Sequence, residues 1–502
     1  MGLASRIQSV LKIDPDRIAV EFEARSLTWG DLGRLIEQID SQLSDAGVGP
    51  GQPVGLLLRN RPEMVGAVLC MLSTRRCIVS LNPQQGGTKL HRDIVEVRVP
   101  ALIAVEDDWS NPDLQKAAQK TGSFGLQLKT SGDGAVQRVP GLEQVSDEPH
   151  RTVNPDIAIE MLSSGTTGRP KRIPLSFEAL EESIVGADHY ESNRSETPSL
   201  QNSFALVSTP LVHIGGMFHM TKSAVDGRPI CLLDRFRLDA WRAAVKKHRP
   251  KVTGLVPASM KMVLDAELPP EELSSLRAVT SGTAPLNPEI QERFESRFGI
   301  PVLITYGATE FAGAVAGWTL RDHREFGSAK RGSVGRAHPG CELRIVDPES
   351  GEVLSENQSG LLEVRSAQAP SRGWIRTTDE AHLDEDAFLW IEGRADGAIN
   401  RGGFKIDPTS VAEALERHPS VREAAVIGLD DDRLGQIPAA LIELKEGAGP
   451  IEESEILDFA RENLTRYYVP VHLKIVDAIP RTPSLKPSQP DIRELFAQEL
   501  SK

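Results

Sequence analysis

The chain has 502 residues, of which 39% are hydrophobic and 25% charged, and its formal net charge is −14. A chain of this length exceeds a single hydrophobic core, so we expect two or more domains. The composition is typical of a soluble globular protein, and the acidic balance disfavours a nucleic-acid-binding protein, which usually carries a basic face.

Expected strands and helices alternate through the first 83 residues. Residues 17–23 and 54–58 predict strands, and residues 31–43 predict a helix that Asp31 can cap. A second helix is predicted from Pro62, followed by a strand over residues 77–81. This alternation indicates a parallel α/β sheet. Residues 106–155 are polar and weakly patterned, and we interpret residues 131–140 as a loop.

A loop rich in hydroxyl groups and glycine follows the apolar-alternating residues 156–160. Backbone N–H groups and hydroxyls of such a loop can hold an anion, and its cations add full charge. The pattern is not a Walker A loop, because its glycines lie three apart and Arg-Pro precedes the lysine. Loop statistics alone favour an ordinary surface turn. The candidate phosphate-binding residues are Ser163, Ser164, Gly165, Thr166, Thr167, Gly168, Arg169 and Lys171.

Two later segments place small or polar residues directly after predicted strands. His213 follows a strand over residues 204–208, and a lone histidine there is more often structural than catalytic. Gly282, Thr283 and Ala284 follow a strand over residues 276–280 and would let a flat ring lie close to the backbone. The alternative is an ordinary turn into the helix that starts near residue 288.

A third segment carries several chemical groups at once. Residues 302–305 predict a buried strand, which ends in Tyr306, Gly307, Thr309 and Glu310. The tyrosine ring can stack on a base, the threonine hydroxyl can donate to a phosphate, and the carboxylate can hold Mg²⁺.

The last third of the chain predicts two further units. Alternating residues 341–347 and 360–364 predict strands of a small β-rich subdomain. After residue 407, helices over 408–418 and 453–464 and strands over 421–429, 439–444 and 472–476 indicate a compact α+β unit.

These motifs together resemble the adenylate-forming superfamily of acyl-CoA synthetases, peptide-synthetase adenylation domains and luciferases, and most of all an acyl-CoA synthetase. The resemblance extends over essentially the whole chain. It departs from the family pattern at Val212, Thr378, Asn400 and Leu485, which stand where an aromatic residue, glycine, lysine and glycine are usual. Arg75 and Arg76 also replace small residues.

The resemblance implies an α/β fold with a large N-terminal domain of several subdomains, parallel-rich sheets and a β-rich part. This adenylation domain, which would bind ATP and the acid, is expected over residues 1–395. A small mobile α+β domain is expected over residues 396–502, with the hinge near Asp396.

The resemblance further implies an ATP-dependent carboxylic acid–CoA ligase that forms an acyl-adenylate. ATP, Mg²⁺ and coenzyme A would be required, with Glu310 as the magnesium ligand. The implied catalytic residues are Lys486, Thr309, Glu310 and His213, with His213 at the acid pocket. The implied cofactor-binding residues are Ser163, Ser164, Gly165, Thr166, Thr167, Gly168, Lys171, Gly282, Thr283, Ala284, Tyr306, Gly307, Asp379, Arg394, Gly402 and Gly403.

Three alternatives stay open. The chain could load an acyl group onto a separate carrier protein, or it could be a non-catalytic nucleotide-binding relative. A P-loop kinase or ATPase is disfavoured by the glycine spacing of the loop. The expected partners are a small carboxylic acid and CoA, without nucleic acid or a membrane span, and a homodimer is possible. Small residues predict a roomy acid pocket: Gly215, Gly216, Ala308, Ala312 and Gly313.

The four cysteines favour a cytoplasmic protein. They include no Cys-x-x-Cys pair, as is typical of reduced thiols. The N-terminus lacks the apolar core of a signal peptide, and no apolar stretch reaches the length of a membrane span.

Overall fold

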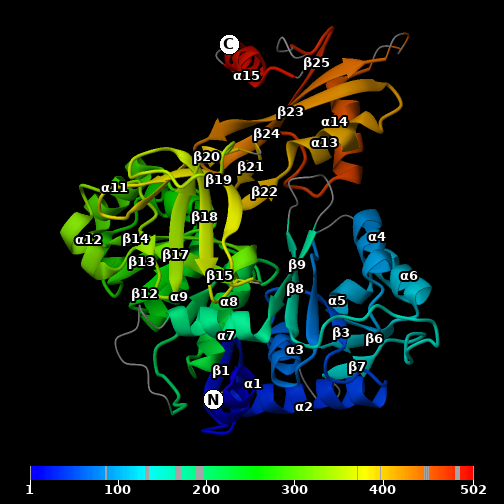
Figure 1. Cartoon of the computed structure of the whole chain (residues 1–502). Helices are drawn as coiled ribbons and strands as arrows, with labels where there is room; N and C mark the ends of the chain where they lie inside the picture. Colours follow the sequence, from blue (N-terminus) through cyan, green and yellow to red (C-terminus); the bar gives the residue numbers. More distant parts are fainter. Residues whose placement is uncertain are drawn as a thin grey trace.

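The structure is a computed structural model that describes residues 2–84, 87–129, 135–163, 171–187, 197–369, 371–395, 397–445, 447, 449, 451–480 and 487–500. The described chain forms five sheets, and the C-terminal one, drawn in orange and red, lies at one end of the molecule (Figure 1). None of the described helices combines the length and apolar character that a membrane crossing requires.

The largest sheet has seven strands in the order β7-β6-β5-β3-β4-β8-β9. Its inner neighbours pair in parallel, while β7 and β9 pair antiparallel at the two edges. The three central strands are buried at every residue, which explains why they read as continuous apolar runs. The strands are β3 (Pro53–Leu57), β4 (Cys77–Leu81), β5 (Ala101–Val105), β6 (Phe124–Leu128), β7 (Val136–Arg138), β8 (Ile157–Ser163) and β9 (Lys171–Ser176).

Two more sheets complete the α/β part of the chain. The first has the order β10-β11-β1-β2, and the second has the order β12-β13-β14-β15-β16, with β12, β13 and β14 parallel. Ligands of parallel sheets bind beyond the carboxyl ends of the strands, which here end near Gly254, Ser281 and Ala308. The strands are β1 (Ile18–Phe22), β2 (Arg25–Thr28), β10 (Ala205–Val207), β11 (Ile230–Leu232), β12 (Val252–Gly254), β13 (Ala278–Ser281), β14 (Val302–Ala308), β15 (Gly313–Gly317) and β16 (Arg336–Ala337).

Helices flank these sheets. In α2, Thr28 and Asp31 form a reciprocal capping box, so Asp31 occupies the third helical position and Thr28 the N-cap. The helices are α1 (Leu3–Leu11), α2 (Trp29–Asp45), α3 (Pro62–Ser73), α4 (Gly87–Val97), α5 (Glu106–Trp109), α6 (Pro112–Thr121), α7 (Phe177–Gly186), α8 (Ile214–Val225), α9 (Leu238–His248), α10 (Pro257–Asp265), α11 (Pro288–Phe298) and α12 (Leu320–Phe326), with 3-10 turns η2 (Pro270–Leu273) and η3 (Thr309–Phe311).

Residues 106–155, which are weakly patterned in sequence, are largely structured. This stretch holds α5, α6, β6 and β7. Helix α6 buries Leu114 but otherwise small residues, Ala117 and Ala118, and its outer face is polar. Its apolar stripe is therefore too thin to stand out in the sequence. Of the predicted loop, residues 131–134 lie outside the described part, and residues 136–138 form β7.

Arg76, one of the departures from the family pattern, has a structural role. Its side chain is 1% exposed and donates hydrogen bonds to Val48 O at 2.8 Å, Asp40 Oδ1 at 2.6 Å and Ser44 Oγ at 3.0 Å. The guanidinium thereby joins the end of α2 to the start of β4. Arg75 ends α3 in the left-handed region, with φ of 56°.

The β-rich part is an antiparallel four-stranded sheet, β17-β18-β19-β20. Thr378, where a glycine is usual, lies inside its third strand, so no tight turn is required at that position. The strands are β17 (Cys341–Val346), β18 (Gly360–Ser366), β19 (Ile375–Leu383) and β20 (Leu389–Arg394).

The C-terminal sheet has the order β22-β21-β24-β23, with β25 parallel to β24. The predicted fold class is confirmed: parallel-rich sheets, a β-rich part and a small α+β C-terminal unit (Figure 1). The elements of this unit are β21 (Ile399–Arg401), β22 (Phe404–Ile406), α13 (Pro408–Glu416), β23 (Val421–Asp431), β24 (Gly435–Leu444), α14 (Glu453–Asn463), β25 (His472–Val476) and α15 (Gln489–Leu500).

Candidate active site

The predicted phosphate-binding loop connects two antiparallel strands. Its ends, Ser163 in β8 and Lys171 in β9, lie opposite each other in the ladder. Ser164, Gly165, Thr166, Thr167 and Gly168, together with Arg169, lie outside the described residues, as do the side chains of Ser163 and Lys171. The two described ends of this loop therefore lie at the edge of the seven-stranded sheet.

Thr309 and Glu310 form the turn η3 directly after β14, and this turn lies against β9. The turn closes with Ala312 in the left-handed region, at φ of 53°. The carboxylate of Glu310 makes no hydrogen bond or ion pair with any residue of the described chain. A half-buried carboxylate that has no partner among the described residues, on a turn that contacts β9, fits a magnesium ligand.

Tyr306, Asp379, Arg394 and Thr378 form one hydrogen-bonded cluster. The phenol of Tyr306 donates to Asp379 Oδ2 at 2.5 Å, and Arg394 donates to Asp379 Oδ1 at 2.7 Å. The second terminal nitrogen of Arg394 donates to Thr378 Oγ1 at 2.5 Å. Burial, reinforced by the charge of Asp379, raises the pKa of Tyr306 well above its ordinary value, so the phenol remains a donor. The cluster joins β14, β19 and β20 around a buried carboxylate.

The turn after β13 depends on close backbone contacts. A Cβ on Gly282 would lie 2.7 Å from Thr305 Oγ1, and one on Gly307 would lie 2.1 Å from a backbone oxygen. Thr283 has φ of 70°, an unusual conformation for a β-branched residue, which stores about 1–3 kcal/mol of strain. Thr283 is exposed and Ala284 is half-buried, so this turn presents small groups to the space beyond the sheet.

The hairpin between β21 and β22 reaches this turn from the C-terminal unit. A Cβ on Gly403, whose φ is 90°, would lie 2.9 Å from Thr283 Oγ1. The neighbouring Phe404 ring meets the His213 ring edge-on, with centroids 4.4 Å apart. Burial lowers the pKa of His213 to about 4, so its imidazole is neutral at physiological pH. Gly402 and Gly403 therefore lie beside Thr283 and His213.

Further contacts hold the C-terminal unit in this position. Tyr467 stacks on Phe404 with ring centroids 4.0 Å apart, and Asn82 donates to its hydroxyl at 3.5 Å. Lys89 donates to Thr465 Oγ1 at 3.2 Å. These residues connect the end of β4 and α4 with the small unit.

Lys486 and the hinge residue Asp396 lie outside the described residues, as does Leu485. Asn400, where a lysine is usual, has a buried side-chain oxygen without a hydrogen-bond partner among the described residues.

The structure does not support all five small residues as pocket-forming. A Cβ on Gly216 would lie 2.2 Å from Pro210 O, so this glycine permits a close backbone contact instead. Gly313 likewise packs closely on a neighbouring hydroxyl, and Ala312 is wholly buried in the main core. Gly215, by contrast, has space, with Thr283 Cγ2 its nearest neighbour at 3.7 Å.

The sequence interpretation missed Phe404, Tyr467 and the hydroxyl of Thr378. An aromatic residue directly after Gly402-Gly403 was a usable signal, because an exposed hairpin tip rarely carries one without a packing partner. Nothing local to Tyr467 indicates its contact with Phe404, which joins segments 63 residues apart in sequence.

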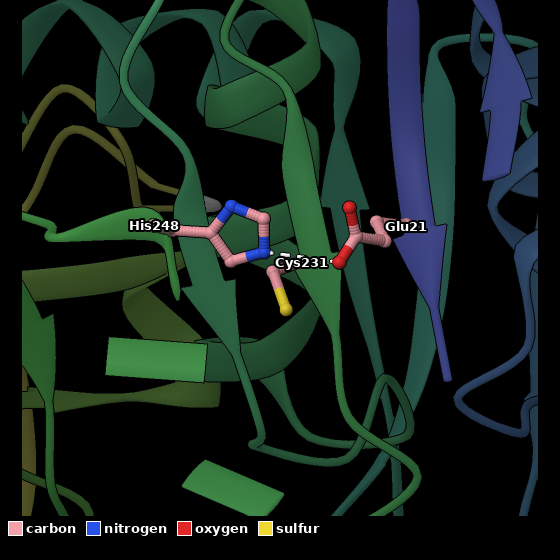
Figure 2. A group of neighbouring side chains, drawn as sticks. All are labelled: Glu21, Cys231 and His248. Atoms are coloured by element: carbon pink, nitrogen blue, oxygen red, sulfur yellow. Dashed lines mark hydrogen bonds and ion pairs between the residues drawn. The ribbon is translucent and has the colours of Figure 1, made fainter. Parts of the chain in front are cut away.

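One described group of side chains has metal-ligating chemistry: Glu21, Cys231 and His248, from β1, β11 and the end of α9 (Figure 2). His248 Nε2 lies 3.0 Å from Glu21 Oε1, and Lys247 pairs with the same oxygen at 2.5 Å. The lysine already neutralises the carboxylate, and none of these elements carries a predicted site residue. We interpret the group as a structural ion pair.

Comparison with known proteins agrees with this arrangement. The family described as AMP-binding enzyme matches residues 8–372, and its C-terminal domain matches residues 410–486. The chain is 29% identical to an indoleacetate–CoA ligase of Aromatoleum aromaticum, over 99% of each chain.

Two solved structures share the fold. The amide bond synthetase McbA of Marinactinospora thermotolerans is 26% identical, with a TM-score of 0.84 over 99% of this chain and 100% of that one. A double mutant of o-succinylbenzoate CoA synthetase from Bacillus subtilis, bound with a product analogue, is 24% identical, with a TM-score of 0.81 over 97% and 98% of the two chains. The predicted family resemblance is thus confirmed, and the chain belongs to the AMP-binding enzyme family.

Proposed function

We propose that this chain is an ATP-dependent carboxylic acid–CoA ligase that works through an acyl-adenylate. The ligase class expected from the sequence is borne out by the relatives, among them the CoA ligase for indoleacetate. The observation that supports a thiol as the acyl acceptor is the contact that the β21–β22 hairpin makes with the turn after β13. Gly403 lies against Thr283, and the adjoining Phe404 meets the neutral His213. The two glycines of the tip, Gly402 and Gly403, allow close approach of an extended thiol arm.

In the first half-reaction, a carboxylate oxygen of the acid attacks the α-phosphate of ATP and pyrophosphate leaves. Asp379, held by Tyr306 and Arg394, accepts hydrogen bonds from the ribose hydroxyls. The loop over residues 163–171, Thr309 and Lys486 stabilise the developing charge. No general base is required because the carboxylate is already ionised, so the neutral His213 acts by positioning.

Glu310 would hold Mg²⁺, which when bound neutralises charge on the phosphates. Its carboxylate is half-buried, and the described residues offer it no competing cation.

In the second half-reaction, the thiol attacks the acyl carbonyl and AMP leaves. We propose that residues 396–502 rotate as a unit about Asp396 relative to residues 1–395, withdrawing Lys486 and bringing in Gly402 and Gly403. The contacts of Phe404 with His213 and Tyr467 support this proposal, because they bring the hairpin of Gly402 and Gly403 next to residues 1–395.

The decisive test measures AMP and pyrophosphate release with a panel of aliphatic, aryl and polycyclic acids, with and without CoA. We expect release that depends on a particular acid and a thioester that forms only with CoA. Lys486→Ala should lower acyl-adenylate formation by about a hundredfold or more. Lys445→Ala is the matched control, because Lys445 lies in the same unit and its exposed side chain donates to Pro419 O, its one side-chain partner among the described residues.

The other outcomes separate the alternatives. AMP release without a thioester, followed by acylation of a phosphopantetheine carrier protein, would favour the carrier-loading function. Amide formation with a supplied amine would favour the activity named for the structural relative McbA. ADP formation, or tight ATP binding without turnover, would contradict the adenylation mechanism. A homodimer and a cytoplasmic location stay predictions, which sedimentation and fractionation would test.

A further inference from the structure

A second histidine, His219, faces the space between α8 and the ends of β12 and β13. A Cβ placed on Gly254 would lie 3.6 Å from His219 Cε1 and 3.6 Å from Thr280 Oγ1. The imidazole of His219 and the hydroxyl of Thr280 therefore lie on either side of Gly254, separated by at most twice 3.6 Å. A methyl group at this position would be in ordinary van der Waals contact with both neighbours, so the space over Gly254 fits a group of about that size.

The surroundings of His219 are those of a recess. Its side chain is exposed by surface area, yet burial by the surrounding protein lowers its pKa below the ordinary value. A group is both accessible and desolvated when it lines a concave site with low-dielectric walls. The imidazole is therefore neutral, with one nitrogen a donor and the other an acceptor.

Neither His219 nor Thr280 uses its side-chain polar atoms in a hydrogen bond to any residue in the described part of the chain. The hydrogen bond recorded at His219 involves its backbone oxygen, which accepts from Ser223. Polar groups in a recess that lack protein partners are available to a ligand.

The recess continues the acid side of the proposed active site. His219 follows Gly215 by four residues, so both lie on one face of α8. A Cβ on Gly215 would lie 3.7 Å from the methyl carbon of Thr283, and the ring of His219 lies next to Gly254. Four helical residues span about 6 Å along the axis, which is the length of a phenyl ring with its para substituent.

The recess also lacks a described positive charge. Lys222, the cation of α8, is buried and paired with Asp226 one helical turn away. The three nearest atoms to a Cβ on Gly254 belong to His219 and Thr280, and neither side chain is a permanent cation. A second carboxylate at this depth would lose its hydration without gaining a counter-ion.

Resting on the proposed ligase function, we propose that His219 is a specificity-determining residue of the acid pocket. It recognises an uncharged hydrogen-bonding group, such as a hydroxyl or ring N–H, at the end of the acid remote from the carboxylate. Thr280 offers the second contact, and Gly254 leaves the space that this group occupies.

The test compares acids of matched shape in acid-dependent pyrophosphate release. The aryl series is para-hydroxyphenylpropanoic, para-methylphenylpropanoic and para-carboxyphenylpropanoic acid, and the aliphatic pair is an ω-hydroxy acid and its methyl-terminated analogue. We expect wild type to prefer the hydroxy acids by about tenfold in kcat/KM, since a site built for a hydrogen bond rejects the analogue that lacks it. The dicarboxylic acid should be the poorest substrate.

Variants separate recognition from folding. His219→Leu should remove the hydroxy-over-methyl preference while the methyl acid is still consumed, and His219→Asn should restore part of it. Gly254→Ala, which adds a methyl at contact distance, should lower kcat/KM for all para-substituted acids and spare unsubstituted phenylpropanoic acid. Phe298→Leu is the control, because that ring packs on Phe294 within α11, with centroids 4.9 Å apart; the preference should persist.

An equal rate for hydroxy and methyl acids in wild type, or an unchanged preference in His219→Leu, would overturn the inference. The inference would also be overturned if the enzyme consumed other acids but no acid of either matched series. Absence of pyrophosphate release with every acid would instead overturn the proposed ligase function. The two failures are therefore distinguishable in one experiment.

Discussion

The two ends of the candidate site differ in how their polar groups are satisfied. At the proposed nucleotide end, Asp379 already accepts hydrogen bonds from Tyr306 and Arg394, and Arg394 also donates to Thr378. At the acid end, the imidazoles of His213 and His219 make no hydrogen bond to any described residue. Both imidazoles are neutral because burial lowers their pKa values.

On the proposed assignment, this difference in hydrogen bonding would let the reaction with ATP stay the same while the accepted acid changes. A carboxylate fixed by several protein donors is preorganised for a ligand that never varies, and its reorganisation costs little. Neutral groups without protein partners leave the hydrogen bonds to the substrate, so replacing one residue alters the acid that is accepted. The predictions below test each end separately, from the largest expected effect to the smallest.

Removing the carboxylate at the nucleotide end should have the largest effect. Asp379→Ala deletes the acceptor that Tyr306 and Arg394 hold, together with its proposed bonds to ribose. Two charge-assisted hydrogen bonds of about 1.5–3 kcal/mol each correspond to a loss of a hundredfold or more in kcat/KM for ATP. Steady-state pyrophosphate release measures it, and a loss below about tenfold would contradict the ribose assignment.

Removing the ring of Phe404 from the β21–β22 hairpin should slow only the half-reaction that forms the thioester. Phe404→Ala removes the ring that meets His213 and stacks on Tyr467, so the thioester step should slow by about tenfold while acyl-adenylate formation is retained. Single-turnover assays with and without CoA separate the two steps. Phe459→Ala is the matched control, because that ring packs on His418 within the same unit. Equal slowing of both steps would contradict the proposal.

The departure at Thr378 should have a smaller effect. Thr378→Val keeps the shape of the side chain but removes the oxygen that accepts from Arg394. We expect KM for ATP to rise by about fivefold, which corresponds to the net loss of about 1 kcal/mol for one hydrogen bond that supports the site indirectly. Thr378→Ser keeps the hydroxyl and should behave as wild type. A valine variant with unchanged KM would show that Arg394 needs no such support.

The smallest effect concerns pH. The pKa of His213 falls from 6.5 to about 4 on folding, so between these values the unfolded state binds a proton that the folded state does not. Its contribution to stability is complete above about pH 6.5 and is lost as the pH falls towards about 4. His213→Phe should therefore reduce the fall in Tm between about pH 7.5 and about pH 5, by about 1–2 °C. An unchanged fall would contradict a neutral buried His213.

Much of the fold could be predicted because it is encoded locally. Buried parallel strands such as β3 and β4 are continuous apolar runs, and α3 begins at a proline. Helix α8 was missed because its apolar content is spread around the helix, and its first turn holds two glycines. The order of the motifs along the chain was enough to predict the family, because each motif is a short run of residues that can be recognised locally.

The sequence by itself determined the α/β architecture, the motifs at the strand ends and the AMP-binding family, since these depend on periodicity and on residue types at short spacing. Only the tertiary structure decided which groups meet: Thr378 with Arg394, Phe404 with His213, and His219 with Gly254 and Thr280. Each of these contacts joins residues distant in sequence. Such pairings follow from how the sheets and the C-terminal unit pack together, which no local pattern encodes.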